Sequence, residues 1–390
     1  VKVRGSRVNP YTAGSICDKV AKYYPDFVHG DRRLHTPLLR RGKPGSGEFE
    51  PISWDDALAM IAERTRQVID EFGPQSVLPF NYAGPHGQLA VGSMDRRFFH
   101  KLGATLLDRG PLCGGVRGAA YESLFGNAPG MPPEQAADAD LIAVWGNNVT
   151  VSNLHLARVI KQAREQGARL IVVDPKRTRI AEQAHLYLQI EPGTDVVLAL
   201  AVSAEIERRG KLNQSFIDRW VAGYDAFMNE ARRYTLEQAA GLCRVPLDDI
   251  RQLVDWYCEA DTLALSIGNG IERGKSGGSG LRAIMSISVL LGQFGRRGAG
   301  VIAKPGFAFA TTPQALQRPD LIPEGTRTLN IVDVGRHLLH DDLDPPIRAA
   351  FIYNHNPVAT HPDQNRMRRA LGRDEIFKVG IDVVMTDSME

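Results

Sequence analysis

The side chain best suited to metal or redox chemistry in this sequence is Cys113, within the glycine- and proline-rich segment 109–115. Free cysteines usually lie in hydrophobic cores, but packing does not explain a thiol in a segment of this composition. A soft thiolate in such a loop suits one of the heavier transition metals. A structural thiol and a metal ligand are the two interpretations of Cys113.

The other cysteines, Cys17, Cys243 and Cys258, are widely spaced and form no CxxC pair. This spacing argues against a disulfide framework and against a self-contained zinc site. Cys243 and Cys258 fall in segments with helical patterns, so they are expected in the core. Cys17 alone cannot hold an iron–sulfur cluster, because a cluster needs about four thiolates.

Glycines and asparagines follow three short apolar runs, in the segments Gly146-Asn147-Asn148, Gly268-Asn269-Gly270 and Asn354-His355-Asn356-Pro357. Both residue types tolerate left-handed backbone, and asparagine amides can pair with ring edges or phosphate oxygens. Ordinary turns between strands and helices use the same residues. The segments therefore indicate either a shared nucleotide crevice or ordinary turns.

Asp174 ends a further apolar run and is followed by Pro175, Lys176, Arg177 and Thr178. Its carboxylate could accept hydrogen bonds from a ribose or a guanine, with Arg177 available for a phosphate. The alternative role of Asp174 is to cap the turn. No GxGxxG motif follows a first strand and no GxxxxGK[ST] motif occurs, so a nicotinamide-dependent dehydrogenase has weak support.

The elements that must position these residues begin with two β-branched runs, Leu141–Gly146 and Leu170–Asp174. Both runs are too short for helices, and the segment between them has apolar residues at helical spacing. This pattern predicts a β-α-β unit with parallel strands and a right-handed connection. Ligands of open α/β sheets lie at the carboxyl ends of the strands, so an anion-bearing nucleotide is the expected ligand.

Strand and helix patterns alternate along most of the chain, which predicts an α/β fold with two interleaved doubly wound domains, the central one Rossmann-like. The predicted helices are 57–72, 93–102, 195–209, 246–260 and 365–371, with an apolar helix after Gly280 and a helical hairpin over 210–234. The further predicted strands are 75–81, 105–108, 262–267, 349–353 and 377–385. Residues 304–323 are expected to form a less ordered link.

Composition limits the classes of function. The chain has 390 residues, 43% of them hydrophobic, which is enough for two or three domains. A formal charge of +2 provides no basic field for nucleic acid. The longest apolar run, 195–206, is too short to span a membrane. Because the sequence starts at Val1 and stops after VVMTDSME, both ends are expected to be cut.

The succession of motifs resembles one family, the molybdenum or tungsten bis-pyranopterin guanine dinucleotide oxidoreductases, also called the dimethyl sulfoxide reductase or formate dehydrogenase family. The matching segments occur in the family's order through nearly the whole chain. They are Asn9-Pro10, 14–19, Arg33-Leu34, Pro37-Leu38, 52–57, 145–148, 173–178, 192–195, 268–270 and Asn356-Pro357.

The layout of the predicted elements indicates two α/β domains, 49–108 with 308–390 and 109–307, and the resemblance adds their roles and the flanking domains. Residues 1–48 would be the remnant of an N-terminal iron–sulfur domain, and residues 49–108 with 308–390 a discontinuous α/β domain. Residues 109–307 would be the Rossmann-like dinucleotide-binding domain. The family's C-terminal molybdopterin dinucleotide-binding domain would be missing.

The resemblance also implies residue roles. Cys17 would be the last ligand of a 4Fe–4S cluster, Lys19 would lie between cluster and pterin, and Cys113 would hold molybdenum or tungsten. The residues implied to bind the dinucleotides are Gly146, Asn147, Asn148, Asp174, Pro175, Arg177, Thr178, Gly193, Asp195, Gly268, Asn269, Gly270, Asn356 and Pro357. His86 would carry protons and Arg117 would anchor an anion, unless both are surface residues.

The implied function is that of a catalytic subunit that performs a two-electron redox step or oxygen-atom transfer on a small substrate, as in anaerobic respiration. Electrons would pass through the cluster to an iron–sulfur subunit. The alternatives within the family are a non-redox hydratase similar to acetylene hydratase and a non-catalytic subunit like that of respiratory complex I. The compartment stays open between cytoplasm and periplasm, with the cytoplasm preferred.

Overall fold

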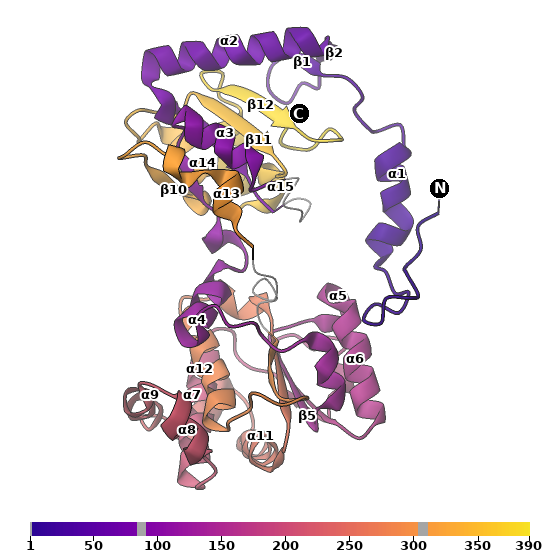
Figure 1. Cartoon of the computed structure of the whole chain (residues 1–390), viewed down its shortest axis with the longest axis vertical. Helices are drawn as coiled ribbons and strands as arrows, with labels where there is room; N and C mark the ends of the chain where they lie inside the picture. The colour runs from indigo at the N-terminus through magenta and orange to yellow at the C-terminus, as the bar shows by residue number, and fades with distance from the viewer. Residues whose placement is uncertain (1, 84–90, 303–310) are drawn as a thin grey trace. The chain divides into compact units, whose positions relative to one another are not determined.

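The structure is a computed structural model, and it describes residues 2–83, 91–302 and 311–390 (Figure 1). Its internal contacts divide the chain into two compact units. The central unit comprises Arg4–Cys17 and Gly114–Ala310, and the discontinuous unit comprises Val1–Val3, Asp18–Cys113 and Thr311–Glu390. Each unit is described by itself below.

The central unit is built on one five-stranded sheet in which every strand pair is parallel. Its strands are β5 (Leu141–Trp145), β6 (Arg169–Val173), β7 (Leu186–Leu188), β8 (Leu263–Ile267) and β9 (Gly300–Ile302), in the order β7-β6-β5-β8-β9. This confirms the predicted doubly wound α/β fold. The order reverses between β5 and β8, which makes the carboxyl ends of these two strands the usual place for a ligand.

Helices cover both faces of this sheet, because alternate side chains of each strand point to opposite faces. One core holds Leu141, Ala143 and Trp145 of β5, and the other holds Ile142 and Val144. The helices that contribute apolar residues to the first core are α4 (Gly115–Phe125), α7 (Asp195–Arg208), α8 (Gln214–Trp220), α9 (Tyr224–Ala231), α10 (Leu236–Cys243), α11 (Leu247–Glu259) and α12 (Gly277–Leu290). The second face is covered by α5 (Val149–Ser152) and α6 (Leu154–Glu165).

The discontinuous unit has a parallel three-stranded sheet in the order β12-β11-β3, with a parallel pair formed by β4 and β10. The strands are β3 (Val77–Asn81), β4 (Leu106–Asp108), β10 (Thr328–Asn330), β11 (Ala349–Tyr353) and β12 (Phe377–Ile381). A small antiparallel pair joins β1 (Leu38–Arg40) to β2 (Phe49–Pro51). The helices are α1 (Tyr24–His29), α2 (Trp54–Phe72), α3 (Met94–Leu102), α13 (Pro313–Gln317), α14 (Val334–His340), α15 (Pro357–Thr360) and α16 (Gln364–Leu371).

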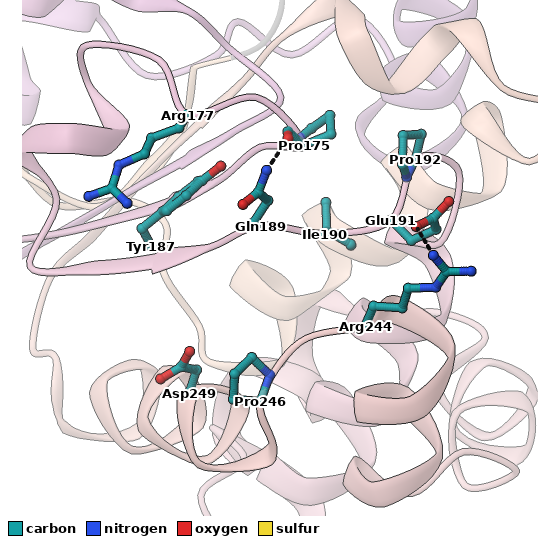
Figure 2. Close-up of a pocket in the computed structure, with 10 residues that line it drawn as sticks. All are labelled: Pro175, Arg177, Tyr187, Gln189, Ile190, Glu191, Pro192, Arg244, Pro246 and Asp249. Carbon is teal, nitrogen blue, oxygen red and sulfur yellow. Dashed lines mark hydrogen bonds and ion pairs between the residues drawn. The ribbon is translucent and has the colours of Figure 1, made fainter.

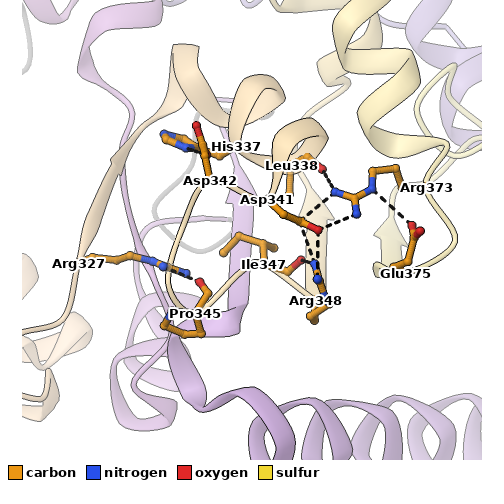
Figure 3. A network of polar contacts seen from close by, with 10 residues as sticks. All are labelled: Arg327, His337, Leu338, Asp341, Asp342, Pro345, Ile347, Arg348, Arg373 and Glu375. Carbon is orange, nitrogen blue, oxygen red and sulfur yellow. Dashed lines mark hydrogen bonds and ion pairs between the residues drawn. The ribbon is translucent and has the colours of Figure 1, made fainter.

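One partly exposed carboxylate joins three elements of the discontinuous unit (Figure 3). Asp341 follows α14, and its Oδ1 accepts a 2.9 Å hydrogen bond from Nη1 of Arg348 at the start of β11. Its Oδ2 accepts a 2.7 Å hydrogen bond from Nη2 of Arg373, just after α16. These guanidinium contacts hold the pKa of Asp341 below its ordinary value. The loops on this side of the sheet are thereby tied together.

Several predicted elements differ from the observed ones. The described part of the predicted link 304–323 contains α13 and a short helix, Pro319–Leu321, each begun by a proline. The predicted strand 377–385 ends at Ile381. Residues 4–17 lie on the central unit, where Nη2 of Arg158 donates to the carbonyl of Tyr11 over 2.6 Å.

Candidate functional site

The strand-end segments after β5 and β8 are in direct contact at the reversal of strand order. The backbone N–H of Gly268 donates a 2.9 Å hydrogen bond to the carbonyl of Trp145. A Cβ atom on Gly268 would lie 1.9 Å from the carbonyl oxygen of Gly146, and Gly146 itself has a φ of +57°. Glycine is therefore required at Gly268 by close backbone approach and favoured at Gly146 by its left-handed backbone.

The asparagines of the first segment are held by hydrogen bonds within the unit. Nδ2 of Asn147 donates to Oγ of Ser266 over 2.9 Å, and Oδ1 of Asn148 accepts from Oγ1 of Thr150 over 2.9 Å. Asn269 begins the short helix Asn269–Arg273, and Gly270 lies against the Gly146 carbonyl. The side chains of Asn147 and Asn148 therefore order the loop, and ligand contact would come from their remaining polar atoms and the backbone.

Asp195 is the first residue of α7, and its side chain is held in position by the last residue of β5. The indole N–H of Trp145 donates a 2.7 Å hydrogen bond to Oδ1 of Asp195. Burial raises the pKa of Asp195, and the nearby Asp174 carboxylate raises it further. A carboxylate can accept about four hydrogen bonds, so Asp195 keeps capacity for a ligand that donates.

Asp174, at the end of β6, is 9% exposed, and burial raises its pKa. Its Oδ1 accepts a 2.8 Å hydrogen bond from the backbone N–H of Lys176, which is the capping geometry that the sequence offered as an alternative. Thr178 is also buried, and its Oγ1 accepts from the N–H of Ala181 over 3.4 Å. Asp174 and Thr178 thus shape the loop that presents Pro175 and Arg177.

An open hollow of about 560 Å³ lies beside this loop (Figure 2). Its lining residues are Pro175, Arg177, Tyr187, Gln189, Ile190, Glu191, Pro192, Arg244, Pro246 and Asp249. The Arg177 guanidinium lies 6.0 Å from the Tyr187 ring centroid, and Nε2 of Gln189 donates to the Pro175 carbonyl over 3.0 Å. The volume is in the range of small-ligand sites.

Most of these lining residues were not predicted from the sequence. Tyr187 lies in the strand β7 and Gln189 follows it, and a strand of three residues is too short to give a recognisable pattern. Arg244 joins the hollow from the end of α10 through an ion pair of 3.5 Å with Glu191.

Gly193 brings the start of α7 next to the start of α12. Its φ is +86°, and its carbonyl accepts a 3.1 Å hydrogen bond from Oγ of Ser276, which precedes α12. A Cβ atom on Gly280 would lie 3.5 Å from Cβ of Asp195. The segments 146–148, 174–178, 193–195 and 268–270 are therefore all arranged around one edge of the central sheet.

Arg117 lies in α4 and is directed at the end of β8. Its Nη1 donates a 3.0 Å hydrogen bond to the carbonyl of Ile267, and its Nε lies 3.7 Å from Oε1 of Glu272. The side chain of Glu272 has no exposed area, whereas that of Arg117 is 21% exposed. The guanidinium therefore balances a buried carboxylate.

The remaining predicted residues lie in the N-terminal part of the chain or in the discontinuous unit. Cys113 is exposed and follows the short helix Gly110–Leu112. Cys17 is partly exposed, and Lys19 begins the π-helix Lys19–Tyr23. His86 lies outside the described residues. Within residues 2–83, 91–302 and 311–390, no group of three or more His, Cys, Asp and Glu side chains could hold a metal ion.

Asn356 holds the end of the sequence against the start of α15. Its Nδ2 donates to Oδ2 of Asp387 over 3.0 Å, and its Oδ1 accepts from Oγ of Ser388 over 2.6 Å. Pro357 is the first residue of α15, and the following N–H, of Val358, donates to the same Ser388 hydroxyl over 2.9 Å. The Asn-Pro motif thus fixes a turn at the end of β11.

Two buried histidines lie near this turn: His355, which belongs to the strand-end segment 354–357, and His361, which was not found from the sequence. His355 and His361 are 8% and 4% exposed, with ring centroids 4.9 Å apart, and both pack edge-on against Phe80. Burial lowers the pKa of His355 to about 3 and that of His361 to about 4. Both imidazoles are therefore neutral near pH 7.

Residues 33–390 match the family model described as molybdopterin oxidoreductase. The chain belongs to this family. Membership confirms the resemblance seen in the sequence, and it implies a pterin cofactor with molybdenum or tungsten. Among the described helices of this molybdopterin oxidoreductase, none has the length and apolar character needed to cross a membrane.

Its relatives include a probable oxidoreductase, YoaE, of Bacillus subtilis (strain 168), 34% identical over 389 residues that cover 100% of this chain and 57% of the relative. Formate dehydrogenase H of Escherichia coli (strain K12) is 24% identical, over 96% of this chain and 55% of the relative. The fold resembles that of acetylene hydratase from Pelobacter acetylenicus, with a TM-score of 0.81 and 22% identity over 96% of this chain and 56% of that structure. The chain thus spans a little over half the length of these relatives.

Proposed function

We propose that this chain is the cofactor-binding and catalytic part of a molybdenum or tungsten bis-pyranopterin guanine dinucleotide oxidoreductase. The reaction is a two-electron redox step or an oxygen-atom transfer on a small substrate, with a 4Fe–4S cluster as the electron path. The observation that carries the proposal is the gathering of segments 146–148, 174–178, 193–195 and 268–270 at the sheet edge where strand order reverses. This is the edge at which α/β sheets bind dinucleotides.

The side chains at this edge fit a guanine nucleotide. A guanine offers adjacent N–H donors, which suit a carboxylate acceptor, and two carboxylates with raised pKa values lie there, the buried Asp174 and the partly buried Asp195. Hydrogen bonds from a base would replace the water that each carboxylate loses on burial. Arg177 and Arg244 line the adjoining hollow and supply positive charge for phosphate groups.

In the discontinuous unit, the exposed thiol of Cys113 would hold the metal. Cys17 would hold the cluster, Lys19 would lie on the electron path, and the Asn356-Pro357 turn would contact a dinucleotide. When bound, the metal–pterin group supplies the exchange of two electrons, and the chain binds it, orients it and excludes water. An iron–sulfur subunit would accept the electrons. Related chains named as alpha subunits of F420-dependent formate dehydrogenases support a multi-subunit enzyme.

The proposal is tested on the full-length protein purified without oxygen. Molybdenum, tungsten and iron are measured by mass spectrometry, pterin by the fluorescence of its oxidised form, and guanine nucleotide by chromatography after acid release. We expect metal, pterin and guanine nucleotide together, with a pair of nucleotides for each metal atom. A folded protein that carries no pterin after expression with an intact cofactor pathway would contradict the proposal.

A substrate screen with a dye as electron acceptor or donor then assigns the reaction class. Turnover that requires the dye supports a redox reaction. Addition of water to an alkyne with no dye present would instead assign the non-redox chemistry of a hydratase, and it would contradict the electron path through the cluster.

A further inference from the structure

Arg109 is a partly buried arginine that has no carboxylate partner. It follows β4, and its Nη1 donates a 2.7 Å hydrogen bond to Oδ1 of Asn81 at the end of β3. Among the described residues, no ion pair involves Arg109. The segments outside the described residues, 84–90 and 303–310, contain no Asp or Glu in the sequence. No carboxylate of the described residues therefore contacts this guanidinium, and Asp95 acts on it only at longer range.

The orientation of Arg109 is fixed by a continuous chain of hydrogen bonds. Nδ2 of Asn81 donates to Oη of Tyr353 over 2.9 Å, and that hydroxyl donates to Oδ2 of Asp95 over 2.9 Å. Asn81 and Tyr353 are 5% and 8% exposed, at the ends of β3 and β11. Two neutral side chains thus separate the cation of Arg109 from the anion of Asp95, so these hydrogen bonds orient Arg109 without forming an ion pair.

A second cation lies near Arg109. Arg96 follows Asp95 on α3, and Asp95 is the last member of the hydrogen-bond chain from Arg109. Burial lowers the pKa of Arg109 and the positive charge of Arg96 lowers it further, whereas the Asp95 carboxylate raises it. The side chain of Arg96 makes no hydrogen bond or ion pair with any described residue. Two guanidiniums that form no ion pair with any described residue give an electropositive site near the carboxyl ends of β3, β4 and β11, and an anion placed there would relieve the repulsion.

Cys113 is close to this electropositive site along the chain. One short 3₁₀ helix, Gly110–Leu112, separates Arg109 from Cys113. A 3₁₀ helix rises about 2 Å per residue, which places the two Cα atoms on the order of 8 Å apart. We propose that Arg109, together with Arg96, binds the oxyanion of a small substrate, such as a carboxylate or a nitrogen oxyanion, beside Cys113. The assignment of this oxyanion as substrate rests on the proposed function.

This site differs from the anion anchor expected at Arg117. That arginine faces the fully buried carboxylate of Glu272 and the carbonyl of Ile267. Within the described residues Arg109 instead donates to a neutral amide alone, which leaves its other N–H groups for a bidentate partner. Oxyanion binding by Arg109 favours charged substrates over uncharged ones of the same size.

Saturation-transfer NMR on the full-length protein tests the proposal, with sodium formate as the probe and formamide as its uncharged counterpart. Each has a C–H proton that reports contact with the protein. We expect transfer to formate and not to formamide. Arg109→Gln should weaken formate binding about tenfold or more, because a charge-assisted hydrogen bond is lost. Arg96→Gln should weaken it several-fold, whereas Arg66→Gln, on the exposed side of α2, should leave it unchanged.

Equal transfer in wild type and Arg109→Gln, or equal transfer to formate and formamide, would overturn the proposal. If Arg109→Gln fails to fold, as judged by circular dichroism, Arg96→Gln carries the test. Arg109→Lys keeps the positive charge but cannot make a bidentate contact, so we expect formate binding between that of wild type and that of Arg109→Gln.

Guanine nucleotide and metal contents of the same variants separate this proposal from the proposed function. Loss of both nucleotide and formate binding in Arg109→Gln would assign the site to a cofactor phosphate and overturn the substrate assignment. Arg109-dependent formate binding in a protein without pterin would support the site and contradict the proposed function.

Discussion

The indole N–H of Trp145 and Oδ1 of Asp195 are joined by a hydrogen bond of 2.7 Å. This bond connects the last residue of β5 to the first residue of α7, 50 positions later in the sequence. It places a carboxylate with a raised pKa at the sheet edge where the dinucleotide is proposed to bind. Asp195 therefore has two roles: it accepts the hydrogen bond of the buried indole, and its negative charge is proposed to bind the nucleotide.

Asp195 substitutions separate these two parts. Asp195→Asn keeps an oxygen acceptor for the indole and removes the charge, so we expect a folded protein with much less bound guanine nucleotide. Asp195→Ala leaves the buried indole N–H without its acceptor and should lower the free energy of unfolding by about 1–3 kcal/mol. Nucleotide release assays and urea unfolding measure the two effects. Asp225→Asn, at the equivalent first-turn position of the exposed start of α9, should change neither.

Gly268→Ala tests the contact between the strand-end segments. The new methyl group would lie 1.9 Å from the Gly146 carbonyl oxygen, so the loops must separate. We expect a loss of unfolding free energy of more than about 2 kcal/mol, in the range of overpacked cores. Gly241→Ala, in α10, meets no atom within 4 Å and should be neutral or stabilise the helix by up to about 1 kcal/mol. A neutral Gly268→Ala would show that the segments are not in contact.

Much of the fold could be predicted because strands such as β5, β8 and β11 are runs of five residues that are buried throughout. Parallel strands covered on both faces give continuous apolar runs of this kind. The three-residue strands β7, β9 and β10 are too short for a pattern. The helix α4 was also not predicted, because glycine and alanine take up much of it and its apolar residues form no clear stripe.

The candidate site was only partly predictable for a different reason. Motifs at strand ends are local, so Asp174 and Asp195 could be named from the sequence. The partners of Arg109 and Arg117 are not local. Nδ2 of Asn81 meets the Tyr353 hydroxyl across 272 positions, and the Arg117 N–H meets Glu272 across 155. No pattern along the chain reports such pairs, so the anion site at Arg109 became visible only in three dimensions.

Asp341 makes the discontinuous unit sensitive to acid. Its pKa is lower in the folded protein than in the unfolded chain, so its stabilising effect is present above about pH 4 and is lost as pH falls further. Asp341→Asn, which tolerates the φ of +50° there, should lower the free energy of unfolding at pH 7 by about 1–3 kcal/mol. The difference from wild type should shrink toward pH 2 in urea unfolding. Asp320→Asn, which removes an exposed pair with Arg318, should cost no more than about 1 kcal/mol at either pH.

His355 and His361 predict a second, distinct dependence on pH. Their pKa values are lowered to about 3 and about 4 in the folded protein, so the unfolded chain binds protons first as pH falls below about 6.5. Stability should therefore decrease from pH 6.5 toward pH 4, by about 2 kcal/mol per histidine at pH 5. His361→Phe should remove its share of this decrease, as measured by unfolding at pH 5 and pH 7. His340→Gln, at an exposed position, should leave the profile unchanged.

Cys113→Ala tests the thiol as a metal ligand in the full-length protein. The side chain is exposed, so its removal should change the free energy of unfolding by less than about 0.5 kcal/mol. Turnover should be abolished and the X-ray absorption spectrum of the metal should lose one sulfur neighbour. Cys17→Ala is the control variant, because it should lower the iron content but leave the number of sulfur neighbours of molybdenum or tungsten unchanged. Unchanged activity and an unchanged metal spectrum in Cys113→Ala would mean that the metal has no thiolate from this loop, and the oxyanion site at Arg109 would then lie beside a metal held by the pterins alone.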